Sequence, residues 1–171
     1  MRLVFGMLAV ACLATVGGCA ASGSSAVPTT APDLGDDAVI FTDKRELMTD
    51  AGPTDDDAPQ EFTSTPSGLK YRILRKADGP QPTATQTVEV HYRGWLDDGS
   101  EFDSSYKRGE PISFPLNRVI AGWTEGVQLV NQGGMIELWI PSELGYGARG
   151  APGAIPPNAT LHFVIELLGV Q

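Results

Sequence analysis

Cysteine is scarce in this sequence, with two residues, Cys12 and Cys19, in a chain of 171. Cys12 lies in an N-terminal segment that we expect to be removed, so the mature chain keeps one cysteine, at its first residue. A disulfide bond inside the folded part is thereby excluded, and the domain must be stabilised by burial of its core. A domain of about 105 residues is long enough for that.

Positive charge is also scarce, because 12 lysine and arginine residues stand against 21 aspartate and glutamate residues, for a net charge of −9. The excess lies in residues 20–65, which carry ten acidic and two basic residues, whereas residues 66–171 carry eleven and nine. Such a chain has no basic face to neutralise phosphates, so we exclude a nucleic-acid partner. The acidity indicates a solvated tail.

Long hydrophobic runs are lacking as well. The apolar run Leu3–Val16 follows Arg2 and has about fourteen residues, which is too short to span a bilayer. It ends in Val16-Gly17-Gly18-Cys19. This resembles the lipobox of bacterial lipoproteins, in which the signal is cut before the cysteine and the thiol is joined to diacylglycerol, although Val16 and Gly17 replace the usual Leu and the usual Ala or Ser.

We therefore predict a lipoprotein signal peptide over residues 1–18 and a lipid bilayer anchor on Cys19. The alternative is an ordinary cleaved signal that leaves a free thiol. Ala20 and Ala21 lack the aspartate that favours retention of enterobacterial lipoproteins in the inner membrane. The expected location is the cell envelope, on the outer membrane, facing the periplasm or the surface.

Residues 19–64 are rich in Ser, Thr, Pro and acid and poor in apolar residues. They cannot bury enough surface to offset the entropy of ordering, so we predict a flexible tether. A short apolar interruption at residues 38–48 leaves a transient strand or a helical turn open.

A folded domain is predicted over residues 65–171. Trp123, Val127 and Val130 share one stripe of a short helix within residues 119–130, which ends at Gly133 and Gly134. A helix this short is marginal in water, so a sheet must cover its apolar stripe. Trp123 by itself is more often core packing than part of a site.

Apolar residues alternate with polar ones in five segments, residues 69–75, 88–93, 112–114, 135–140 and 161–168. No parallel βαβ rhythm is present. The expected fold is α+β, an antiparallel five- to six-stranded half-barrel sheet wrapped around one short helix. Residues 104–110 are expected to form a polar loop, and the Gly- and Pro-rich loop over residues 141–159 to cover a pocket.

Four blocks of sequence carry a resemblance to a known family: residues 88–105 (VEVHYRGWLDDGSEFDSS), 119–123 (VIAGW), 144–147 (LGYG) and 155–163 (IPPNATLHF). In this order they closely resemble the FKBP-type peptidyl-prolyl cis-trans isomerases, over residues 65 to 170. The resemblance implies an FKBP-like fold and an enzyme that assists the folding of exported proteins at X-Pro bonds. It implies no cofactor and no metal.

The resemblance also assigns a site. Trp123 forms the floor of an aromatic pocket, Asp103 is the single acid at its rim, and Arg108 is placed to pair with Asp103. The amide of Ile120 and the hydroxyl of Tyr146 are the expected donors to a ligand carbonyl. The catalytic residues implied are Asp103, Tyr146, Tyr92 and Trp123, and the substrate-binding residues are Phe102, Val119, Ile120, Ile155, Phe163, Arg108 and Ile112.

Three positions depart from the family pattern: Ile112 replaces an aromatic wall residue, Ala151 a loop histidine and Ala154 an isoleucine. They widen or flatten the rim, so they affect the substrate preference and the affinity for rapamycin-type macrolides more than the activity. The expected partners are proline-containing unfolded or flexible polypeptides. Bacterial relatives of the macrophage-infectivity type carry an N-terminal helical dimerisation region, which this sequence does not show, so we expect a monomer.

Two other functions stay open. A binding module would dock proline-containing segments without turnover, and a cell-surface β-rich adhesin would have no use for the pocket. Metal chemistry is excluded, because His91 and His162 occupy outward strand positions without cysteine partners. Hydrolase chemistry is disfavoured because Ser104 and Ser105 have no partnering base.

Overall fold

The computed structural model describes residues 50–171. The predicted signal peptide, Cys19 and residues 19–49 of the predicted tether lie outside the described residues. Within residues 50–171, no helix has the length and the apolar character needed to cross a bilayer.

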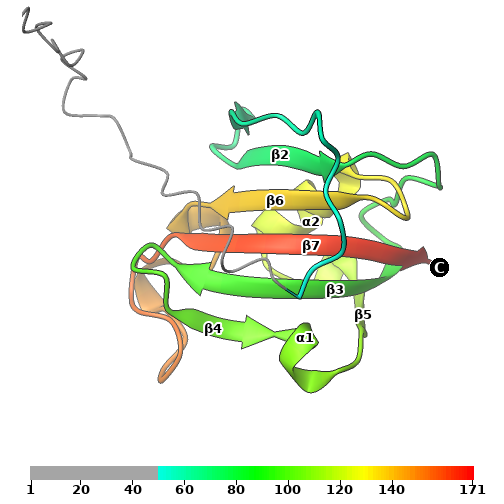
Figure 1. Ribbon diagram of the computed structural model, residues 1–171. Helices are drawn as coiled ribbons and strands as arrows, with labels where there is room; N and C mark the ends of the chain where they lie inside the picture. Colours follow the sequence, from blue (N-terminus) through cyan, green and yellow to red (C-terminus); the bar gives the residue numbers. More distant parts are fainter. Residues whose placement is uncertain (1–49) are drawn as a thin grey trace, which may run out of the picture. The chain divides into compact units, whose positions relative to one another are not determined.

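One antiparallel sheet of seven strands forms the framework (Figure 1). The strands follow one another in space as β1-β2-β6-β7-β3-β4, and β5 also pairs with β3. Their bounds are β1 (Thr63–Ser64), β2 (Lys70–Arg75), β3 (Thr87–Leu96), β4 (Glu101–Ser104), β5 (Ile112–Pro115), β6 (Met135–Ile140) and β7 (Leu161–Val170). The predicted antiparallel class is therefore confirmed.

The long strand β3 has a divided outer edge. Its full length pairs with β7 on one side, whereas on the other side β5 pairs with residues 87–90 and β4 with residues 93–95. A single-turn helix, α1 (Ser105–Arg108), connects β4 to β5 along this edge (Figure 1). Ser104 caps its start, because the Ser104 hydroxyl accepts a hydrogen bond from the Lys107 amide, and Gly109 ends it with a φ of 75°.

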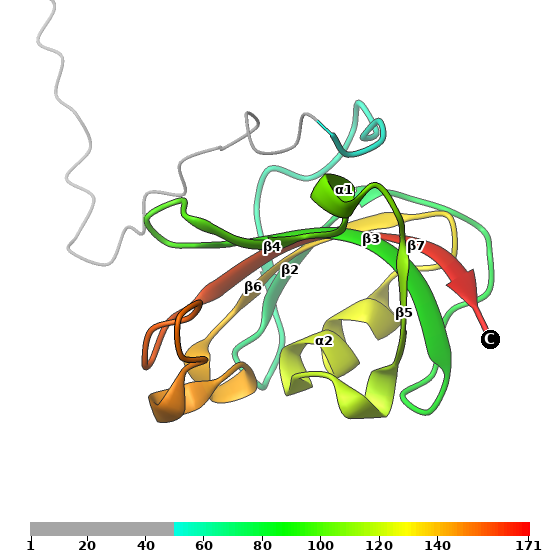
Figure 2. The same cartoon turned by 90° about the horizontal axis from the view of Figure 1, so that it is seen from below.

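The predicted central helix is present as α2 (Ala121–Gly126), followed by the 3₁₀ turn η3 (Val127–Leu129). Ile120 is its N-cap, and both helical segments lie within the predicted residues 119–130. It lies on the concave face of the curved sheet (Figure 2). Trp123, Val127 and Val130 are buried there against inward residues of β6 and β7 such as Leu138 and Ile165, which explains how so short a helix is stabilised.

The opposite, convex face of the sheet carries a second apolar cluster, made of Leu74, Trp95, Met135 and Val164. Residues 50–62, here called the strap, run across this face in front of β7, β6 and β2 (Figure 1). The strap contributes Ala51 to the cluster, and the amide of Asp55 donates to the carbonyl of Leu74 at 2.8 Å. The sheet is thus covered on both faces.

The strap changes one prediction. Residues 50–64 belong to the segment predicted to be a flexible tether, but they pack on the domain and end in β1, which pairs with β2. Their anchors are main-chain hydrogen bonds, Ala51 and polar contacts with distant side chains such as Glu166 and Arg75, and these leave no periodic signal in the sequence.

Two further differences concern the edge of the sheet. The sheet has seven strands rather than five to six, because the two-residue β1 and the polar β4 were not expected. Residues 104–110, predicted to form a loop, contain the last residue of β4 and the helix α1.

In the predicted loop over residues 141–159, two 3₁₀ turns are present, η4 (Ser142–Leu144) and η5 (Gly147–Arg149), and Ala151 bridges to Ile155. A third, η2 (Leu116–Arg118), precedes α2.

Candidate functional site

A cavity of about 670 Å³ opens between the concave face of the sheet, α2 and the β4–α1–β5 edge. This volume falls within the range typical of sites for small ligands. The cavity is lined by Tyr92, Phe102, Asp103, Arg108, Ile112, Phe114, Arg118, Val119, Ile120, Trp123, Tyr146 and Phe163.

Trp123 forms the floor of this cavity. Only 4% of its surface is exposed, and three rings meet it edge to face at centroid distances of 5.2 Å (Tyr92), 5.3 Å (Phe163) and 5.7 Å (Phe114). Each such pair contributes about 0.5–1.5 kcal/mol beyond the burial of its surface. The floor is therefore fixed from three sides before any ligand enters.

The two wall rings of the cavity, Phe102 and Phe163, have room to pack because the residue beneath them is a glycine. Gly94 in β3 lies between Asp103 on β4 and Phe163 on β7. A Cβ atom at Gly94 would stand 2.7 Å from both the Phe102 and Phe163 rings, which pack edge to face at 5.4 Å. Glycine here allows the two rings to meet above the strand.

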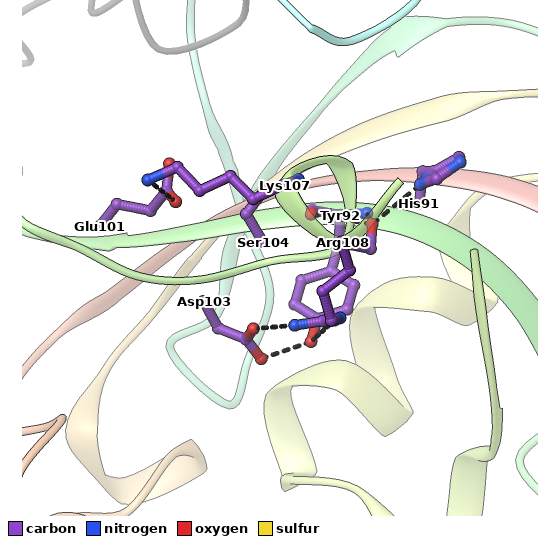
Figure 3. A network of polar contacts seen from close by, with 8 residues as sticks. His91, Tyr92, Glu101, Asp103, Ser104, Lys107 and Arg108 are labelled. Carbon is purple, nitrogen blue, oxygen red and sulfur yellow. Dashed lines mark hydrogen bonds and ion pairs between the residues drawn. The ribbon is translucent and has the colours of Figure 1, made fainter. Parts of the chain in front are cut away.

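The polar rim is built by three side chains (Figure 3). Tyr92 in β3 donates its hydroxyl hydrogen to Asp103 in β4, and Arg108 in α1 donates to the other oxygen of Asp103 at 2.5 Å. Arg108 also donates to the Tyr92 hydroxyl at 2.9 Å and lies over the Tyr92 ring. These contacts close a ring of hydrogen bonds in which both carboxylate oxygens of Asp103 are engaged.

The electrostatics of the rim follow from these contacts. Burial raises the pKa of Asp103, but hydrogen bonds from Tyr92 and Arg108 outweigh it, so the pKa lies below its ordinary value. Burial and the neighbouring Asp103 together raise the pKa of Tyr92 to about 12. At neutral pH the rim therefore holds a carboxylate, a neutral phenol and a guanidinium.

The structure brings ten of the eleven predicted site residues to the cavity. The exception is Ile155, which is 7% exposed and packs in the core rather than lining the cavity. Its backbone forms an antiparallel bridge with Ala151 in the loop over residues 141–159. Tyr146, in contrast, is 43% exposed at the cavity mouth.

Two lining residues were not predicted, Phe114 and Arg118. Phe114 is two residues from Ile112 in β5 and so shares its face of the strand. That alternation could have identified it. Arg118 lies in η2, where no sequence pattern marks it.

The two histidines are placed on the convex side but are not exposed. His91 stacks on Tyr106 at 4.8 Å and shares a hydrogen bond with Ser105, while His162 stacks on Trp95 and pairs with Asp97. They were predicted to be exposed strand residues. Bulky neighbours from α1 and β3 cover them instead. Among residues 50–171, no three His, Cys, Asp or Glu side chains converge as a metal site would require.

Comparisons with known proteins agree on one family. The profile of the FKBP-type peptidyl-prolyl cis-trans isomerases matches residues 79–168. The chain is 54% identical over 108 residues to the FKBP-type peptidyl-prolyl cis-trans isomerase FkpA of Aeromonas hydrophila, covering 63% of this chain and 40% of that protein. It is 51% identical over 107 residues to the FKBP-type 22 kDa isomerase of Escherichia coli, covering 63% and 52%.

Solved structures give the same result. The crystal structure of FkpA from Escherichia coli superposes with a TM-score of 0.64 at 49% identity, covering 66% of this chain and 53% of that one. The crystal structure of AtFKBP13 superposes with a TM-score of 0.61 at 39% identity, covering 65% and 99%. The chain thus spans about 40 to 50% of the curated relatives it matches.

Proposed function

Because this chain belongs to the FKBP-type peptidyl-prolyl cis-trans isomerases, we propose that its cavity catalyses rotation about X-Pro bonds in exported polypeptides. The observation that carries the proposal is the open, ring-lined cavity above Trp123, with Asp103 and Tyr146 at its mouth. The proline ring packs on the indole, and the peptide bond before it rotates at the rim.

The aromatic cavity lowers the barrier by favouring the twisted amide. Resonance makes a planar amide polar and gives it a rotation barrier of roughly 18–20 kcal/mol. Twisting removes the resonance, so the twisted form is less polar than either planar form and gains relative stability in an apolar cavity. A millionfold acceleration needs about 8 kcal/mol, whereas one neutral hydrogen bond contributes about 0.5–1.5 kcal/mol. Binding of the twisted form by the whole cavity is therefore the main contribution.

The polar groups orient the substrate. The amide of Ile120 and the hydroxyl of Tyr146 donate to substrate carbonyls. For Asp103, the contacts favour an organising role, because both of its oxygens are already bound by Tyr92 and Arg108. In this role Asp103 fixes the Tyr92 ring, which is one wall of the cavity and one of the rings that hold Trp123.

The test is catalysis of refolding in a protein whose folding is limited by proline isomerisation, together with a peptide series varied before proline. Full-length protein at micromolar concentration should accelerate both reactions. Asp103→Ala and Tyr146→Phe should lower turnover moderately with the fold intact, and Trp123→Ala should also weaken binding. The control is Asp97→Ala, which removes an exposed acid at the far end of the β3–β4 hairpin.

Absence of acceleration with retained peptide binding would leave a binding module. Unchanged turnover in all three cavity variants would refute the site assignment. The same cavity is proposed to bind rapamycin-type macrolides, with an affinity set by Ile112 at the wall, and titration with rapamycin tests this.

The proposed setting is the cell envelope. Lipidation of Cys19 would attach the chain to a bilayer, and residues 19–49 would act as a tether between the lipid and the strap. The support is the run Val16-Gly17-Gly18-Cys19 after an apolar segment. The mass of the mature N-terminus tests lipidation directly, and Cys19→Ser should release the protein from the membrane fraction. We further expect a monomer, which light scattering of the Cys19→Ser protein would check.

A further inference from the structure

Glu166, on the convex face of the sheet, accepts hydrogen bonds from several separate segments of the chain. It is 8% exposed, and one of its oxygens accepts hydrogen bonds from the strap, through the Gly52 amide, and from α1, through the Tyr106 hydroxyl, both at 2.6 Å. Its other oxygen accepts from Arg75 at 3.0 Å, and Arg75 also donates to the strap carbonyl of Pro53. One carboxylate in β7 therefore connects the strap with α1.

Helix α1 depends on its side chains for its position. Four residues make a single turn, which is not stable in isolation. Ser105 accepts a hydrogen bond from the Tyr92 amide at 2.7 Å, Tyr106 binds Glu166 and stacks on His91, and Lys107 pairs with Glu101 at 2.7 Å. The fourth side chain, Arg108, turns to the cavity and binds Asp103 (Figure 3).

Because the four side chains leave one turn in different directions, the three outer contacts fix the direction of the fourth. Ser105 and Lys107 hold the two ends of the turn to β3 and β4. Tyr106 holds it to β7, and it is the only one of these three contacts whose partner, Glu166, is also bound by the strap. The strap also limits the access of water to Glu166, which strengthens the bond from Tyr106.

We propose that Tyr106 is a positioning residue: held by Glu166 beneath the strap, it fixes the turn of α1 that places Arg108 on Asp103, so that docking of the strap and the arrangement of the cavity rim are coupled. The proposal rests on the proposed function for its catalytic consequence. Its structural part, the coupling between strap and rim, can be measured without any catalysis.

The test uses the full chain with Tyr106→Phe, which removes the hydroxyl and keeps the ring on His91. The first measurement is the titration of the Asp103 carboxyl by ¹³C NMR, since Arg108 and Tyr92 hold its pKa below the ordinary value. Release of Arg108 should raise this pKa. The second measurement is kcat and KM on a prolyl peptide, where kcat/KM should fall by up to about tenfold, the full effect of losing one hydrogen bond to a charged acceptor.

A second variant acts on the strap. Gly52→Pro removes the amide that binds Glu166 and places ring atoms where a Cβ would already stand 2.7 Å from Arg75, so the strap should detach there. It should shift the Asp103 titration in the same direction as Tyr106→Phe. The matched control is Asp57→Asn, which breaks the exposed strap contact to Lys76 and should leave the titration and kcat/KM unchanged.

An Asp103 titration that stays at its wild-type position in Tyr106→Phe would overturn the positioning role. A shift in Tyr106→Phe without one in Gly52→Pro would overturn the coupling to the strap. If the wild-type chain has no isomerase activity and both variants shift the titration, the proposed function fails while the coupling is supported.

Discussion

The approach of α2 to the sheet provides a stringent test of the packing, because two opposing effects act on one residue. Gly122 lies in α2, buried against β6, and a Cβ built on it would stand 2.4 Å from Cγ2 and 2.8 Å from Cδ1 of Ile140. Carbon atoms in contact prefer about 3.5–4.0 Å. Helix propensity favours alanine over glycine by about 1 kcal/mol, whereas overpacking a core costs about 1–3 kcal/mol.

We expect the steric cost to exceed the gain in propensity. Ile140 has no exposed surface, and its nearest atom, Cγ2, is attached to the β-carbon, so only rotation about χ1 or a shift of the helix relieves the clash. Gly122→Ala should therefore lower the free energy of unfolding by up to about 2 kcal/mol, which is the steric cost less the gain in propensity. A shift of α2 would also move the adjacent Trp123, so kcat/KM should fall as well.

Urea unfolding followed by tryptophan fluorescence measures the change in stability. Ala121→Gly, at an exposed position of the same helix, calibrates the propensity effect, and we expect a loss of about 0.5–1 kcal/mol there. Gly122→Ala combined with Ile140→Ala should be less destabilised than the sum of the two single changes, because the second change removes the clash. A Gly122→Ala protein as stable as wild type would refute the close packing of α2 on β6.

Three further predictions concern other parts of the domain. Arg72→Met should cost about 1.5–3 kcal/mol in thermal or urea unfolding because it removes the charged hydrogen bond at 2.6 Å to the largely buried Glu137, whereas Arg72→Met with Glu137→Leu should recover part of that loss. Gly94→Ala should lower stability by about 1–3 kcal/mol and raise the KM for prolyl peptides, because its Cβ displaces the Phe102 and Phe163 rings. The third prediction is a pH dependence of the strap. Burial raises the pKa of Glu166, but hydrogen bonds from Gly52, Tyr106 and Arg75 lower it by a larger amount, so the pKa of Glu166 is lower in the folded state than in the unfolded state. The stabilisation is complete above the ordinary value of about 4.3 and is lost as the pH falls through the folded pKa, so the hydrogen-exchange protection factor of the Gly52 amide should fall in that acidic window and not near neutrality.

The parts of the fold that were predicted are those with a regular apolar repeat. In β7, Leu161, Phe163, Ile165 and Leu167 all point to the inner core, as the alternation indicated. In α2 and η3, the stripe of Trp123 and Val127 located the helical segment within residues 119–130. An element that is buried on one face has apolar residues at the spacing of a helix or a strand, and such elements can be predicted without structural information.

The parts that were missed are held by polar contacts between distant segments. Strand β4 carries Glu101, which is bound by Arg93 at 2.5 Å and by Lys107, so its polar residues are satisfied by partners that no local pattern reveals. The strap shows the same limitation, because its anchor on Glu166 joins residues 114 positions apart. Ile155 was placed in the wall by resemblance; it packs in the core cluster and is not among the residues that line the cavity.

The floor and the rim of the cavity are therefore held by different forces. Trp123 is fixed by three edge-to-face rings and by the sheet behind it, so moving it requires repacking of the core. The rim is held by hydrogen bonds and ion pairs of α1, whose partners are partly exposed to solvent and replaceable one at a time. Changes at the floor should accordingly affect stability and binding together, whereas changes at the rim should alter catalysis with little loss of stability. Ile112, which replaces an aromatic wall residue and is only partly buried against the core, is thus a position where substrate preference can change at less cost to the fold than at Trp123.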